Sequence, residues 1–161
     1  MCFRKFVLPL IAIATMAVAQ TSTTTRTQTF SFGPVGIGST ESAEINVLNA
    51  ASASSSGTAA SCTGSISFAS STGTAIGTAT TFTVTSGQVF SVSVPFSKVA
   101  TSGSRAEIVG SVALTFTSGA SAPCSLVSAF ETFDTSSGVT HVHLAGSAQS
   151  SGPIGFGGGG H

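Results

Sequence analysis

Short runs of alternating apolar and polar residues recur along this chain, and they constrain its fold more than any other feature. In the run 89–96, Phe90, Val92, Val94 and Phe96 occupy every second position. Successive side chains of a β-strand point to opposite faces of a sheet, so this alternation gives one buried and one solvated face. Gly- and Ser-rich breaks, which are typical of turns, separate the runs. The pattern predicts an all-β protein with antiparallel sheets.

About eight such runs follow one another at the spacing typical of a β-sandwich or barrel. The one stretch that could rival them as a helix, 41–53, is rich in β-branched residues and ends in serines, so we interpret it as a strand. Long, irregular connections favour a sandwich over a barrel of tight hairpins. The predicted strands are 27–34, 42–49, 65–69, 80–85, 89–96, 105–117, 125–133 and 139–144.

The first nineteen residues have the layout of a secretory signal peptide. Arg4 and Lys5 give a basic start, an apolar run covers 6–18, and Ala17-Val18-Ala19 offers a small-x-small cleavage site. A retained membrane anchor is the alternative, but the apolar run is shorter than the roughly 20 residues that a spanning helix needs. We therefore predict export to the periplasm or the extracellular space, with no membrane span in the mature chain.

The rest of the chain is predicted to hold one folded domain between two low-complexity ends. Residues 1–19 form the signal peptide, 20–26 a Ser/Thr-rich leader, 27–145 the β-sandwich domain and 146–161 a Gly/Ser-rich tail. A tail of this composition gains little from burial and loses much conformational entropy on ordering, so we expect it to be flexible.

The charge balance excludes one class of partner. Of the five basic residues, two lie in the signal peptide, which leaves Arg26, Lys98 and Arg105 against five acidic residues. A surface with so few positive charges lacks the basic patch that attracts the phosphate backbone of a nucleic acid. We therefore expect no nucleic acid among the partners.

Cys62 and Cys124 are the two cysteines that follow the signal peptide. In an exported protein such a pair is interpreted first as a disulfide, with two reduced thiols as the alternative. Each cysteine lies just before a predicted strand, 65–69 or 125–133. If the strands alternate in direction, these two run the same way, which places both sulfurs at one end of the sandwich. Neither cysteine belongs to a Cys-x-x-Cys motif, so redox catalysis has little support.

His141-Val142-His143 is the candidate metal site. Residues two apart on a strand share a face, so both imidazoles could approach one ion, and Glu131 could lie across from His141 and supply a carboxylate. The pattern is similar to that of copper/zinc superoxide dismutase, but the ligand count differs because His161, the one other histidine, lies in the tail. Two polar side chains on a solvated strand face are the alternative, and we expect no bound cofactor.

Signals for catalysis are weak. The chain has no Gly-x-Ser-x-Gly elbow. The segment 33–38 is rich in glycine but lacks the Lys-Ser/Thr of a phosphate-binding loop, and we interpret it as a turn connector. Glu131 and Asp134 are three residues apart, but solvated acids at a strand end are far more common than paired catalytic carboxylates. We expect no enzymatic activity.

The segment 32–40, Phe-Gly-Pro-Val-Gly-Ile-Gly-Ser-Thr, precedes a strand at 43–49 that ends in Asn. This arrangement resembles the opening of bacterial immunoglobulin-like modules, and the stretch 27–144 is similar to small exported bacterial proteins. The resemblance implies an immunoglobulin-like antiparallel β-sandwich of about 7–8 strands and no activity. This chain differs from antibody-type domains, since it lacks their core Trp and their corner Tyr.

These observations predict an exported, non-enzymatic structural, adhesive or binding module of the bacterial cell envelope. Its expected partner is another protein or a second copy of itself, held through an unpaired edge strand. The alternative is a small extracytoplasmic metal-binding protein that uses His141 and His143.

Overall fold

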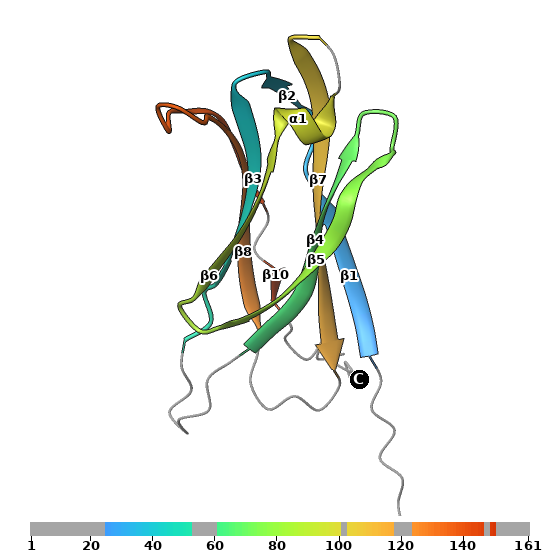
Figure 1. Ribbon diagram of the computed structural model, residues 1–161. Helices are drawn as coiled ribbons and strands as arrows, with labels where there is room; N and C mark the ends of the chain where they lie inside the picture. Colours follow the sequence, from blue (N-terminus) through green and yellow to red (C-terminus); the bar gives the residue numbers. More distant parts are fainter. Residues whose placement is uncertain (1–24, 53–60, 101–102, 118–123, 147–148, 151–161) are drawn as a thin grey trace, which may run out of the picture.

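Two antiparallel β-sheets pack face to face in the structure, which is a computed structural model (Figure 1). It describes residues 25–52, 61–100, 103–117, 124–146 and 149–150. The described helix is a single turn, α1 (Phe96–Val99). The prediction of an all-β protein with a sandwich of antiparallel sheets is confirmed.

The first sheet is built around β7, the longest of the described strands. β1 and β2 pair one after the other with one edge of β7, β4 pairs with its other edge, and β5 forms the far edge of the sheet. The strands are β1 (Thr25–Ser31), β2 (Val35–Gly38), β7 (Arg105–Thr117), β4 (Ser61–Ser70) and β5 (Ala75–Thr85).

The second sheet is centred on β8 and β3. β9 and β10 pair with one edge of β8, β3 pairs with the other, and β6 pairs with β3 to form the far edge. The strands are β9 (Thr140–Ala145), β10 (Gln149–Ser150), β8 (Ser125–Asp134), β3 (Glu41–Asn49) and β6 (Val89–Pro95).

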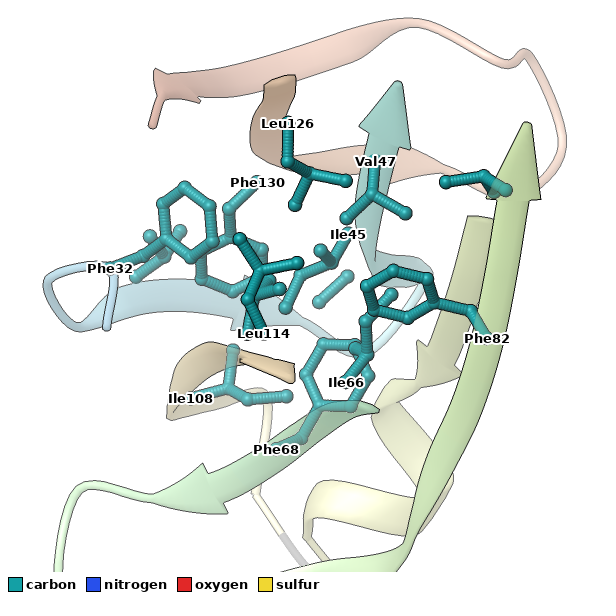
Figure 2. Close-up of a cluster of buried hydrophobic side chains, with 14 of the residues drawn as sticks. Phe32, Ile45, Val47, Ile66, Phe68, Phe82, Ile108, Leu114, Leu126 and Phe130 are labelled. Atoms are coloured by element: carbon teal, nitrogen blue, oxygen red, sulfur yellow. The ribbon is translucent and has the colours of Figure 1, made fainter. Parts of the chain in front are cut away.

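The core lies between the inner faces of the two sheets. On β3, Ala43, Ile45 and Val47 are fully buried while Glu44 and Asn46 between them are partly exposed, as the alternation predicts. Removing this apolar surface from water is the main force that holds the sheets together. Figure 2 shows the cluster in which the second sheet contributes Ile45, Val47, Leu126 and Phe130, and the first sheet contributes Ile66, Phe68, Phe82, Ile108 and Leu114.

The described structure differs from the sequence prediction in several short segments. Phe96, predicted to end a strand, begins α1, and β4 and β5 begin before the predicted runs 65–69 and 80–85. The segment 33–38, expected to be a turn connector, contains β2, whose Val35 and Ile37 are buried. Residues 25 and 26 of the predicted leader belong to β1, and two residues of the predicted tail form β10. The signal peptide, residues 20–24 of the leader and residues 147–148 and 151–161 of the tail lie outside the described residues.

A disulfide joins the two sheets at one end. Cys62 lies at the start of β4 in the first sheet, and Cys124 directly precedes β8 in the second. Their Cα atoms are 5.2 Å apart and both residues are buried. The predicted pairing is confirmed. Among the described residues, no helix is long and apolar enough to cross a membrane.

Candidate functional site

A pocket of about 460 Å³ lies between the edge strands β2 and β9 on one side of the sandwich. We call it the β2–β9 pocket. Both sheets contribute to it, because β2, β3 and β7 meet β8 and β9 there. Its lining consists of Gly36, Gly38, Glu41, Ser104, Arg105, Thr132, His141 and Val142.

An acid–imidazole pair forms one wall of this pocket. Glu41 begins β3, and its Oε1 is hydrogen-bonded to Nδ1 of His141 on β9. Its second oxygen, Oε2, accepts the backbone N–H of Gly38 at 2.6 Å. A carboxylate only accepts, so Nδ1 of His141 carries the proton, and Nε2 is the acceptor of the neutral ring. The Glu41 side chain is only 14% exposed, against 47% for His141.

These contacts set the ionisation of Glu41. The hydrogen bond from Gly38 and then the one from His141 lower the pKa of the Glu41 carboxyl below its ordinary value, because both stabilise the charged form. Desolvation and the nearby Asp134 act in the opposite direction but do not outweigh them. Glu41 is therefore ionised at neutral pH, and its charge is already satisfied by protein donors.

Arg105, the first residue of β7, brings a positive charge to the same pocket. It lies opposite Gly38 in the β2–β7 register and is exposed. Its guanidinium lies across Gly36, where any Cβ would collide with it. Glycine at this position therefore lets the long side chain lie along β2. Within the described ranges, the Arg105 guanidinium has neither a carboxylate nor a hydrogen-bond partner.

Thr132 of β8 forms the buried part of the lining. Its side chain is fully buried, and its Oγ1 has no hydrogen-bond partner among the residues that the structure describes. An unsatisfied hydroxyl in such a place costs about 1–3 kcal/mol. Thr132 is therefore a polar group for which the described fold supplies no partner.

The residues of the predicted metal site have different neighbours. Glu131 lies opposite His143, so the expectation that it faces His141 is wrong. Glu131 pairs with His143 and Thr132 with Val142, and the register then shifts so that Phe133 pairs with Thr140, which leaves His141 unpaired.

Glu131 and His141 consequently bind different groups. Glu131 accepts hydrogen bonds from Asn46 Nδ2 at 2.8 Å and from Thr140 Oγ1 at 3.4 Å, whereas His141 binds Glu41. In the described part of the chain, no group of three or more His, Cys, Asp or Glu side chains is placed to hold a metal ion.

Sequence reasoning did not single out Glu41, Arg105 or Thr132 as residues of a site. Glu41 had one local signal, its place directly after a Gly-rich turn and at the start of an alternating run. Arg105 was notable only as one of few cations, and Thr132 was one threonine among many. No spacing motif connects residues so far apart in the chain.

A carboxylate–imidazole pair can hold a histidine ready to act as a base. That role also needs a nucleophile in contact with Nε2, and no hydroxyl of the described residues is hydrogen-bonded to that atom of His141. The pocket instead offers a cation, a polarised imidazole and a buried hydroxyl. Comparison with known protein families, curated proteins and solved structures gives no match.

Proposed function

We propose that this protein is an exported, non-enzymatic structural, adhesive or binding module of the bacterial cell envelope that associates through its edge strand β6. The observation that carries the proposal is the character of this edge. β6 is a regular edge strand without a charged side chain, and its one blocking feature, Pro95, lies at its last position. The immunoglobulin-like classification remains a prediction, supported by the resemblance in sequence and by the two antiparallel sheets.

The β6 edge is regular and uncharged. All seven residues pair with β3 without a register shift, from Leu48 opposite Val89 to Ser42 opposite Pro95. Its sequence, Val-Phe-Ser-Val-Ser-Val-Pro, contains no charged side chain. A regular strand with an unpaired outer edge offers its backbone N–H and C=O groups to an incoming strand.

The other edge strands have features that disfavour the addition of a strand. β5 has a register shift against β4 and a positive φ at Gly77. β9 has a register shift and presents two imidazoles. β1 carries Arg26, and β2 and β10 have only four and two residues. Bulges, charges and short length each disfavour edge pairing.

The strand that fits β6 best is a second copy of β6. Exposed serines alternate with partly buried apolar residues along it. Two copies of β6 can pair antiparallel about a two-fold axis. The serine side chains of both strands then lie on one face of the joined sheet, and the apolar side chains lie on the other. Because no charge lies on the strand, such a pair suffers no like-charge repulsion. We therefore expect a homodimer with one sheet continuous across the interface.

The test is the mass of the protein in solution, measured by light scattering after size exclusion over a wide range of concentration. The wild-type protein should dimerise, and Ser93→Lys on β6 should make it monomeric. Thr83→Lys, which places the same charge at an exposed site on the β5 edge, is the matched control and should remain dimeric. A wild-type protein that stays monomeric, or equal effects of the two lysines, would contradict the proposal.

Export is the second part of the proposal, and it rests on the signal-peptide layout of residues 1–19. The Cys62–Cys124 disulfide supports it, since disulfides persist in oxidising compartments such as the periplasm and the extracellular space. The intact mass of the protein recovered outside the cytoplasm should correspond to a chain that begins at Gln20 and has lost two thiol protons.

The alternative proposal, a metal-binding protein that uses His141, His143 and Glu131, has weaker support. His141 is already bonded to Glu41, and it shares its pocket with the Arg105 guanidinium, whose charge repels a cation. Native mass spectrometry without chelator decides between the two, because a stoichiometric metal ion that is lost in His143→Ala would favour the alternative.

A further inference from the structure

We propose that the β2–β9 pocket binds a small hydroxylated organic acid. The Arg105 guanidinium holds its carboxylate, and its hydroxyl groups contact Thr132 and the Glu41–His141 pair. This site is independent of the β6 edge, which lies on the far edge of the second sheet from β9.

The charge of Arg105 determines the first element of the ligand. A guanidinium is planar and donates two parallel hydrogen bonds to a carboxylate, which makes the pair stronger and more specific than a single contact. In the described structure Arg105 has no such acceptor, although the ionised Glu41 lines the same pocket. Glu41 is instead satisfied by Gly38 and His141. The cation therefore remains for an acid that comes from outside the chain.

The acceptors in the pocket determine the second element. Nε2 of His141 is the acceptor of the neutral ring, because Nδ1 is bonded to Glu41. The Glu41 carboxylate also has accepting capacity beyond its two hydrogen bonds. Hydroxyl groups of a ligand can donate to both residues. A ligand that carries only a charge cannot make these hydrogen bonds.

Thr132 gives evidence for a ligand that does not depend on Arg105 or on the Glu41–His141 pair. Its hydroxyl is fully buried against the pocket and is without a hydrogen-bond partner in the described ranges. Since a buried hydroxyl normally has a partner, a ligand hydroxyl that reaches this point recovers a hydrogen bond that the described fold does not make. Because Thr132 is fully covered, the contact requires a small rotation of the pocket floor, and the backbone amides of Thr132 and Val142 should report it.

The volume sets the size of the ligand. At about 460 Å³ the pocket falls within the range of about 300–1,000 Å³ that is typical of small-molecule sites. A sugar acid of six carbons is of suitable size, and gluconate is a convenient probe. It carries one carboxylate for the single guanidinium and a chain of hydroxyl groups for the acceptors.

The experiment is a titration of the ¹⁵N-labelled protein by NMR, because the chain has no Trp or Tyr that could report binding by fluorescence. Gluconate is compared with sorbitol, which keeps the hydroxyl groups, with propionate, which keeps a carboxylate, and with inorganic phosphate. Gluconate should shift the amides of Gly36, Gly38 and Arg105 and bind at least about tenfold more tightly than the other three probes. Equal binding of sorbitol, tighter binding of phosphate or no shift at these amides would overturn the proposal.

Variants separate the site from adventitious binding. Arg105→Gln should weaken gluconate binding by about tenfold or more, because it removes the charge-assisted pair. Lys98→Gln, an exposed cation on α1 outside the pocket, is the matched control and should leave binding unchanged. Should Arg105→Gln fail to give a folded spectrum, Arg105→Lys tests the same point, since it keeps the charge but not the two-pronged donor. Undiminished binding in the folded Arg105 variant, or equal loss in the Lys98 variant, would refute the assignment.

Discussion

Removal of the Cys62–Cys124 disulfide should lower the free energy of unfolding of this protein by about 4 kcal/mol. The bond is the covalent link between a strand of one sheet and the chain that enters β8 of the other. Both cysteines are buried, at 1% and 5% exposure. The double variant Cys62→Ala/Cys124→Ala therefore removes the cross-link without placing new polar groups in the core.

The magnitude follows from the length of the loop that the bond closes. The cysteines are separated by 62 residues. In the chain-entropy model, closing such a loop removes about 14 cal/mol/K from the unfolded chain, or about 4 kcal/mol at 25 °C. Whole domains have a free energy of unfolding of only about 5–15 kcal/mol. With a urea m-value of about 1.5 kcal/mol/M, the midpoint should fall by about 2–3 M.

The assay is urea unfolding followed by far-ultraviolet circular dichroism, since Trp and Tyr fluorescence are lacking. The wild-type protein unfolded in the presence of reductant is the matched control and should reproduce the midpoint of the double variant. The m-value should rise in both, because an unfolded chain without the cross-link exposes more surface. A loss of less than about 1 kcal/mol would refute the assumption that the bond acts through the entropy of the unfolded chain.

Two further predictions concern the pocket. Thr132→Val replaces the unpartnered hydroxyl by a methyl group of similar shape, so it should raise the free energy of unfolding in urea by about 1 kcal/mol while it weakens gluconate binding; a lower stability would show that the hydroxyl has a partner in the fold. Glu41 has a pKa below its ordinary 4.5, so it stabilises the fold above that pH and the contribution is lost as the pH falls through the folded pKa. Urea midpoints measured from neutral to acid pH should therefore fall less steeply in Glu41→Gln than in the wild-type protein, and parallel profiles would contradict this.

The architecture was predictable because its cause is local in the sequence. Alternation assigns each side chain to a face, and on β3 it identified Ala43, Ile45 and Val47 as core residues before any pairing was known. The Cys62–Cys124 bond was predictable for a similar reason. Cys62 lies at the start of β4 in one sheet, Cys124 directly precedes β8 in the other, and their sulfurs meet at one end of the sandwich.

The short strands were not predictable from their own residues. β2 has two glycines among its four residues, and glycine disfavours strands, but pairing with β7 and burial of Val35 and Ile37 stabilise it. β10 lies in a Gly/Ser-rich range, and its two residues are strand only because the edge of β8 is available. In both cases tertiary pairing outweighs intrinsic preference.

The sequence by itself therefore determined the fold class, the buried faces and the disulfide, because these depend on alternation and on residue type. Only the tertiary structure decided the pocket. Glu41 and His141 are 100 residues apart and meet because a single register shift between β8 and β9 leaves His141 unpaired. Since a shift of one residue moves side chains to the opposite face of a strand, the register decides which histidine meets which carboxylate. Register is a property of the paired strands together, and no residue of either strand encodes it alone.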